Sequence, residues 1–267
     1  MVDGGGLENR CTRKGTGGSN PSPSESWLAA LEARHLANLT PTEVARALRA
    51  LSSCYVERRA KLASGGALDS AGKRAAFALF YAPVHFVVVR NIVRSLSPAA
   101  TPRARIIDLG CGTGSAGAAW ALEAGHSRIT GFDRNPWAVA EANWTYRQLG
   151  LEGGASQQEI SRISLKGSPD TGVLAGYVVN ELADDARAAL LPRLLQLRGR
   201  GTQVLVVEPI ARRLTQWWSE WQQRFEAAGG RFDEWRFAAD LPNRQRDLAR
   251  AAGLDPRELT ARTLFLA

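Results

Sequence analysis

The 267-residue sequence is poor in the residues that most often build metal sites and cross-links. It contains 3 cysteines and 3 histidines. The cysteines, Cys11, Cys54 and Cys111, lie far apart in the sequence and form no CxxC pair, and the histidines are equally scattered. The spacing therefore predicts neither a disulfide framework nor a structural zinc site, and we expect no metal.

Long apolar runs are missing as well. The nearest, AAFALFYAPVHFVVV, is interrupted by Pro83 and His85 and is too short to cross a bilayer. The N-terminus lacks the basic-then-apolar pattern of a signal peptide. Hydrophobic residues make up 45% of the chain and charged residues 22%, which is typical of a globular protein. We therefore expect a cytoplasmic protein with no membrane partner.

Lysine is scarce, yet the chain is basic, with a net charge of +8 and a pI of about 10.0. Only Lys14, Lys61, Lys73 and Lys166 are lysines, so arginine supplies most of the positive charge. A basic balance favours a nucleic-acid partner. An arginine bias with abundant alanine and glycine is also what a GC-rich genome produces. Charge alone does not separate these two explanations.

The first part of the chain divides into two regions. Residues 1–25 have the Gly/Ser/Pro composition of a disordered tail. Their segments GGLENR and GGSNPS also resemble the translation of a tRNA gene, so a translation start assigned too far upstream is the alternative. Residues 26–98 have helical periodicity, and Thr40, Pro41 and Glu43 have the spacing of a capped helix start. A second helical stretch in this region is predicted to kink or split near Pro83.

From residue 103 to residue 267 the pattern changes to alternating strands and helices. Clear strands are RARIIDLG, SRITGFD, GVLAGYVVN and GTQVLVVEP, with two late strands in RFDEWRF and ARTLFLA. Residues 155–165 are ambiguous, with a short strand as one interpretation. Repeated strand–helix units predict an α/β fold, a parallel sheet with helices on both faces. The segment LTQWWSEWQQRF predicts a helix whose aromatic face covers this sheet, with RNA stacking as the alternative.

The segment IIDLGCGTG follows the first of these strands and opens a helix. Gly110, Gly112 and Gly114 allow a sharp turn and close approach of a ligand, and the helix behind them offers free amides. Asp108 lies before the first glycine, where a carboxylate would repel a pyrophosphate but suit a cationic ligand. Asp133 ends the next strand, where a carboxylate accepts ribose hydroxyls.

IIDLGCGTG and GFDRN resemble the first and second motifs of the class I S-adenosylmethionine-dependent methyltransferases, over roughly residues 103–267. The resemblance implies a Rossmann-like seven-stranded sheet with an antiparallel last strand, and S-adenosylmethionine as the cofactor. It assigns the cofactor contacts to Asp108, Gly110, Cys111, Gly112, Gly114, Asp133 and Arg134. Trp137 could cover the adenine or pack in the core. For the adenine amine there is no clear match, and Ser161 and Asp170 are the alternatives.

Asn180 and Glu181 end the fourth strand, at the sheet edge where ligands of open α/β folds bind. Base amino-methyltransferases carry Asp/Asn-Pro-Pro-aromatic at this place. This chain has Asn180-Glu181-Leu182, which disfavours that chemistry. We predict Asn180 and Glu181 as catalytic residues, with Glu181 or Glu208 as a general base. The alternative for Glu181 is a hydrogen-bonded loop residue or a cofactor contact.

A narrower resemblance is carried by FALFYAPVHFVVVRNIVRSL, VLAGYVVNEL and VLVVEP, which look like the Rsm22-type proteins associated with assembly of small ribosomal subunits. That family often has a cysteine-rich metal site in its C-terminal half, and this chain has no cysteine after Cys111. Three functions therefore stay open. They are a methyltransferase acting on RNA or the small ribosomal subunit, a non-catalytic assembly or RNA-binding factor of the same fold, and a small-molecule methyltransferase.

Overall fold

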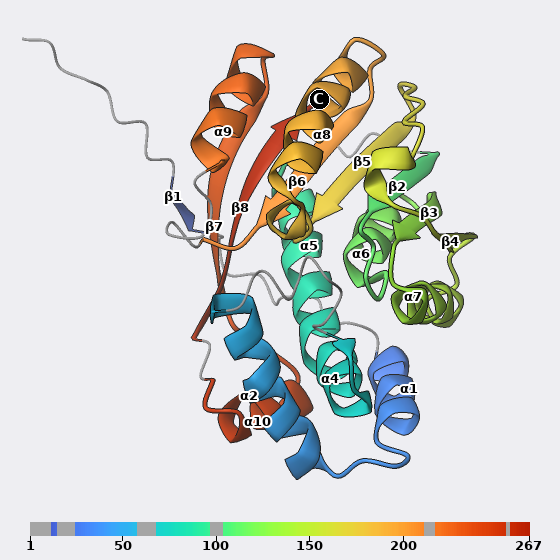
Figure 1. Ribbon diagram of the computed structural model, residues 1–267, viewed down its shortest axis with the longest axis vertical. Coiled ribbons are helices and arrows are strands. Elements are labelled where there is room, and N and C mark those ends of the chain that lie inside the picture. Colours follow the sequence, from blue (N-terminus) through green and yellow to red (C-terminus); the bar gives the residue numbers. More distant parts are fainter. Residues whose placement is uncertain (1–11, 15–24, 58–67, 97–103, 211–216, 255–256) are drawn as a thin grey trace, which may run out of the picture.

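A computed structural model describes residues 12–14, 25–57, 68–96, 104–210, 217–254 and 257–267 (Figure 1). Its described strands form one sheet in the order β1-β7-β8-β6-β5-β2-β3-β4. Their bounds are β1 Thr12–Lys14, β2 Arg105–Leu109, β3 Arg128–Asp133, β4 Gly153–Gln157, β5 Thr171–Gly176, β6 Gln203–Glu208, β7 Arg231–Ala238 and β8 Glu258–Leu266. Among these described strands, β8 alone runs antiparallel to its neighbours. Strands β2 to β8 are the predicted Rossmann-like sheet of seven strands.

Strand β1 is an addition that the sequence did not predict. It pairs in parallel with β7 at the edge of the sheet, with Thr12 opposite Glu234. It falls within the segment predicted as a tail or as an upstream start. The rest of that segment, residues 1–11 and 15–24, lies outside the described residues, so that prediction stays a prediction.

The central strands are apolar on both faces, as parallel strands buried between helices must be. Ile106, Leu174 and Leu205 belong to one buried cluster, which also contains residues of α5, α6 and α7. Their strand neighbours Ile107 and Val173 belong to a second cluster with residues of α8 and α9. Because side chains alternate along a strand, the two clusters lie on opposite faces of the sheet.

The helices on these two faces are α5 (Ala82–Leu96), α6 (Ser115–Glu123), α7 (Pro136–Gln148), α8 (Asp184–Arg198) and α9 (Trp218–Ala227). Trp218, Trp221 and Phe225 of α9 are buried against the sheet. This confirms the sheet-covering face expected for the tryptophan-rich segment; its Leu214 lies outside the described residues.

The remaining helices gather beyond the edge of the sheet toward which β5 points (Figure 1). We call this group, formed by α1 (Glu25–His35), α2 (Pro41–Glu57), α4 (Ala71–Ala76) and α10 (Asn243–Ala251), the helical cap. Helix α5 runs from the cap up along the sheet, packed on α6 (Figure 1). The helix α2 begins with the predicted cap: Glu43 Oε2 accepts from Thr40 N at 2.8 Å. The cap therefore stands where parallel strands present their carboxyl ends.

The helix around Pro83 changes register rather than splitting. A π-helical turn, η2 (Phe77–Tyr81), precedes α5, which continues through Pro83. Because Pro83 has no N–H, it cannot bond to the carbonyl of Leu79 four residues earlier. The buried Gln245 of α10 donates to that carbonyl oxygen through Nε2 at 3.0 Å. The predicted split is therefore not seen: a π turn takes its place, with the Leu79 carbonyl bonded by a residue distant in sequence, and the predicted kink stays a prediction.

The continuous helical stretch Ala71–Leu96 has the length and apolar composition that could cross a membrane, which the sequence run alone did not indicate. Its most apolar window is 78% buried inside the protein, so it is placed here as a core helix.

One buried ionic contact joins the cap to the sheet domain. Glu141 of α7 is fully buried and accepts hydrogen bonds from Arg34 Nε at 3.1 Å and from His35 Nε2 at 2.7 Å. Both partners lie at the end of α1. A buried carboxylate needs such partners, so the contact fixes where α1 docks.

Candidate active site

The glycine loop between β2 and α6 depends on the absence of side chains at two positions. Gly110, Gly112 and Gly114 all have positive φ, at 66°, 53° and 77°. A Cβ on Gly110 would lie 2.2 Å from Cγ2 of Val178, and a Cβ on Gly114 would lie 2.6 Å from Cε1 of Tyr146. Only glycine satisfies both the left-handed backbone and this close packing.

Asp133 ends β3 and holds the glycine loop. Its Oδ2 accepts from Gly112 N at 2.9 Å, and its Oδ1 accepts from Asn135 N at 2.8 Å. Each carboxylate oxygen has two lone pairs, so one acceptor position on each oxygen stays available. Burial raises the pKa of Asp133, and the N–H donors of Asn135 and Gly112 oppose that rise. The carboxylate is thus suited to accept two neighbouring hydroxyl groups, as a ribose offers.

A cavity of about 180 Å³ lies beside this carboxylate. Gly110, Asp133 and Arg134 line it, as predicted for cofactor contacts, and Glu181 lines it from the end of β5. Its other lining residues are Gln158, Glu159, Ile160, Val178, Leu182, Ala183 and Ala186. The cavity therefore brings together the carboxyl ends of β2, β3, β4 and β5.

Gln158 and Glu159 were missed by sequence reasoning. They follow β4, whose residues GGASQ have no apolar alternation and are mostly exposed. The rule that ligands contact the residues after each strand would have found them, had the strand been recognised.

Four predicted cofactor contacts do not line the cavity: Gly112 and Gly114 of the loop, and the buried Asp108 and Cys111. Asp108 is 1% exposed, and its Oδ2 accepts from Gly117 N at 3.1 Å in the first turn of α6. Burial raises the pKa of Asp108 to about 7, opposed by that bond and reinforced by the charge of Asp133. Cys111 is also buried, next to Gly131. Both residues shape the loop here; direct cofactor contact by either stays a prediction.

The adenine partners considered from the sequence lie elsewhere. Trp137 packs against the cap, edge-on to His35 at 6.5 Å and 5.8 Å beneath the guanidinium of Arg74. This favours the packing alternative for Trp137. Neither Ser161 nor Asp170 lines the cavity.

Glu181 follows β5, the strand predicted as the fourth. It is the acidic residue at this strand end that lines the 180 Å³ cavity, called the cofactor cavity below. It lies in the short 3-10 turn η4 (Val179–Glu181), beyond the end of β5. Burial and the charge of Asp133 together raise the pKa of Glu181 to about 7, against the opposing charge of Arg134. Near neutral pH this side chain therefore exchanges a proton readily.

Asn180 faces the other way. Its Nδ2 donates to Glu208 Oε2 at 2.8 Å, and its Oδ1 accepts from Trp217 Nε1 at 2.9 Å. Glu208 is fully buried, and burial raises its pKa to about 8 against the opposing N–H donor of Asn180. Both functional ends of the Asn180 amide are thus occupied, and its contact with an acceptor stays a prediction.

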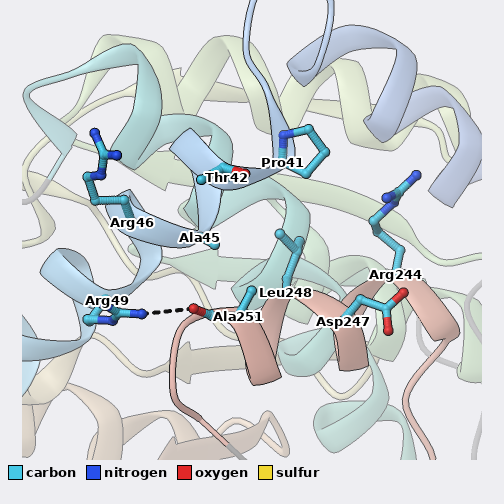
Figure 2. Close-up of a pocket in the computed structure, with 9 residues that line it drawn as sticks. All are labelled: Pro41, Thr42, Ala45, Arg46, Arg49, Arg244, Asp247, Leu248 and Ala251. Atoms are coloured by element: carbon cyan, nitrogen blue, oxygen red, sulfur yellow. Dashed lines mark hydrogen bonds between the residues drawn. The ribbon is translucent and has the colours of Figure 1, made fainter.

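A second, larger cavity of about 390 Å³ lies between α2 and α10 and shares no residue with the first (Figure 2). Arg46, Arg49 and Arg244 are among its lining residues. Arg49 donates to the carbonyl of Ala251 at 2.9 Å, and Arg244 pairs with Glu32 at 3.3 Å. In Figure 2 Arg46 and Arg244 stand on opposite sides of the cavity, so the guanidinium groups do not converge on one point.

Comparison with known proteins finds one matching family, described as a methyltransferase domain, over residues 106–200. No curated protein matches the chain. Among solved structures, the methyltransferase domain of bacterial CtHen1 is similar at 14% identity and a TM-score of 0.48, covering 68% of this chain and 97% of that one. Magnesium protoporphyrin IX methyltransferase from Synechocystis PCC 6803 is similar at 14% identity and a TM-score of 0.46, covering 68% and 78%. Likenesses this remote say nothing about the acceptor.

The matched residues contain most of β2, the glycine loop, Asp133 and the end of β5, so the family match falls on the residues that build the first cavity. The cavity's free carboxylate positions fit a ribose, and its acids fit a cationic group. Residues 106–200 thus match a methyltransferase domain, and S-adenosylmethionine is the cofactor that this cavity fits.

Proposed function

We propose that the chain transfers a methyl group from S-adenosylmethionine to RNA of the small ribosomal subunit, in the cytoplasm. The observation that carries the proposal is that Asp133 and Glu181 both line one cavity at the carboxyl edge of the sheet. The cap stands beyond this same edge (Figure 1), where an acceptor of an open α/β fold would approach. The net charge of +8 supports a phosphate-rich acceptor.

S-adenosylmethionine supplies an electrophilic methyl group on a positively charged sulfur. The residues of this chain bind and orient it. Asp133 would accept the ribose hydroxyls, and Gly110 would let the backbone approach the ligand. Glu181 would place a negative charge in the cavity that receives a cation. Holding the reacting atoms in line supplies much of the rate enhancement of such a transfer.

Glu181 has a second role in this proposal. An acceptor nitrogen or oxygen that gains a methyl group must lose a proton, and Glu181 is placed at the cofactor cavity to receive it. Asn180 acts indirectly, because it fixes the turn η4 to Glu208 at the end of β6. We regard Asn180 as a positioning residue for Glu181.

The test is a transfer assay with radiolabelled S-adenosylmethionine and either purified small ribosomal subunits or a metabolite extract. Label in ribosomal RNA, lost in the Glu181→Gln and Asp133→Asn variants, is the expected result. Label only in small molecules would overturn the acceptor assignment. Cofactor binding with no transfer to either acceptor would overturn the enzymatic proposal in favour of a non-catalytic assembly or RNA-binding factor.

A further inference from the structure

Four aromatic side chains form a continuous group between the glycine loop and the end of β5. We call Phe77, Tyr81, His85 and Tyr177 the aromatic wall. The ring centroid of His85 lies 6.1 Å from that of Phe77, 5.9 Å from that of Tyr81 and 3.9 Å from that of Tyr177. The ring of Phe77 lies 3.7 Å from the position that a Cβ would take on Gly112. The wall therefore begins at the cofactor loop.

The wall is not part of the sealed core. All four of its side chains are partly exposed, whereas their helix neighbours are buried: Ala78, Leu79, Phe80, Ala82, Pro83 and Phe86. Phe77 and Tyr81 bound the π-helical turn η2. A π turn adds a residue to the helical register, and such turns occur frequently at functional sites.

Tyr177 completes the wall in a strained conformation. Its φ is +60°, a left-handed value that a bulky aromatic residue rarely adopts. The backbone is fixed there because Tyr177 N donates to Val207 O at 2.8 Å, one residue beyond the last pair of β5 and β6. The side chain is thereby turned onto His85, with an angle of 12° between the rings. Such strain persists where the surrounding structure holds it, often at ligand contacts.

The wall carries no charge near neutral pH. Burial lowers the pKa of His85 to about 3, so its imidazole is neutral. Burial and the nearby charge of Glu208 raise the pKa of Tyr177, so its phenol is protonated. Flat, uncharged rings gain most from a flat partner, because stacked aromatic pairs combine area burial with favourable ring electrostatics.

We propose that the aromatic wall is the surface on which the methyl acceptor lies, and that it takes a planar heterocyclic ring, such as a nucleobase. The inference rests on the proposed methyl transfer, because it assumes that the acceptor meets the cofactor at the glycine loop. A nucleobase of RNA and a free planar small molecule share this chemistry. The net charge of +8 is compatible with an RNA strand, and the two arms of the binding test separate the two sources.

The binding test uses fluorescently labelled single-stranded oligoribonucleotides and, in a separate arm, free nucleosides. Phe77→Leu and Tyr177→Leu should weaken oligoribonucleotide binding by about 5- to 150-fold, the loss expected for one base–aromatic stack. Phe77→Tyr keeps a flat ring and should bind as the wild type does. The matched control is Phe232→Leu, since Phe232 is also partly buried but lies near the start of β7, at the opposite edge of the sheet.

Affinity for S-adenosylmethionine separates a stacking surface from a structural one. It should be unchanged in Phe77→Leu, because that ring is assigned to the acceptor. Unchanged oligoribonucleotide binding in both leucine variants would overturn the inference, as would a parallel loss of cofactor and oligoribonucleotide binding in Phe77→Leu. Phe77→Leu keeps the test decisive if Tyr177→Leu does not fold. If nucleosides bind as tightly as oligoribonucleotides, the aromatic wall remains the binding surface, but its ligand is a free planar small molecule.

The same variants distinguish this inference from the proposed function. If the wild type binds oligoribonucleotides through the wall but labels no small subunit, the methyl-transfer proposal fails and the wall stands only as an RNA-binding surface. If the wild type labels small subunits and Phe77→Leu does so with the same KM, the wall fails and the methyl-transfer proposal stands.

Discussion

Asn180 and Glu208 are joined by two hydrogen bonds, from Asn180 N to Oε1 at 3.1 Å and from Asn180 Nδ2 to Oε2 at 2.8 Å. Glu208 is fully buried, so these donors offset part of the cost of removing a carboxylate from water. The pair ties the turn after β5 to the end of β6. Glu181, the next residue along the chain, is thereby held at the cofactor cavity.

Asn180→Asp should convert this support into repulsion. The new carboxylate would face that of Glu208, and two buried carboxylates at this distance cannot both ionise. Wild-type Glu208, with its pKa raised to about 8, already holds a proton near neutral pH, so the additional stability loss of the variant grows as pH rises above that value. We expect a loss of about 2–4 kcal/mol in the free energy of unfolding at alkaline pH and a smaller loss near pH 5, measured by urea denaturation. Wild-type stability at alkaline pH would contradict the Asn180–Glu208 geometry.

Glu181 should make cofactor affinity depend on pH. Because its pKa is raised to about 7, the side chain is neutral below that pH and negatively charged above it. Affinity for the sulfonium of S-adenosylmethionine should therefore rise severalfold as pH increases through neutrality. S-adenosylhomocysteine, which lacks that charge, should show a flatter profile by calorimetry. The Glu181→Gln variant should also flatten the pH profile of S-adenosylmethionine affinity. A steep profile in this variant would mean that a group other than Glu181 causes the pH dependence.

A comparison of Gly110→Ala with Gly125→Ala separates the stability cost of close packing from the stability cost of a left-handed backbone. Both glycines have positive φ, at 66° and 80°, but only Gly110 has a neighbour in the way, Val178. Gly125→Ala should cost about 1–2 kcal/mol, the price of a left-handed alanine. Gly110→Ala should cost about 1–3 kcal/mol more and abolish cofactor binding. Thermal unfolding measures the stability of both variants. Val178→Ala added to Gly110→Ala should recover part of the lost stability. Equal losses in the two alanine variants would contradict the close contact between Gly110 and Val178.

Glu141→Gln should loosen the cap. Burial acts to raise the pKa of Glu141, but His35 and Arg34 outweigh it and lower the pKa. The contribution to stability is therefore present above the ordinary glutamate pKa of 4.5 and is lost as pH falls through the lowered value. We expect a loss of about 1–3 kcal/mol at pH 7. The exposed pair Arg236–Glu258 is the control, since Glu258→Gln should lower the free energy of unfolding by about 0–1 kcal/mol. An equal loss of stability in Glu141→Gln and Glu258→Gln would mean that the Glu141 contact does not hold α1.

Much of the sheet could be predicted because its central strands are buried on both faces. β2, β3 and β6 lie within the predicted strands. β4 could not be assigned, because an edge strand of sequence GGASQ carries no apolar alternation. β5 is shorter than expected, because Tyr177 leaves the extended conformation, and Asn180 and Glu181 consequently lie in a turn.

The site was predictable where one local motif sets the geometry and unpredictable where distant segments meet. The glycine loop and Asp133 could be read from spacing along the chain. The direction of Asn180, by contrast, depends on Glu208 and Trp217, which come from other elements. The π turn likewise depends on Gln245 of α10. No local pattern encodes such contacts.

Calorimetric binding of S-adenosylmethionine to the wild type and to Asp133→Asn tests the assignment of the cofactor cavity most directly. The wild type should bind at a single site. Asp133→Asn should bind about 10- to 100-fold more weakly, because it loses the charge-assisted hydrogen bonds of one carboxylate. No binding by the wild type, or equal affinity in the two proteins, would contradict the assignment of this cavity to the cofactor.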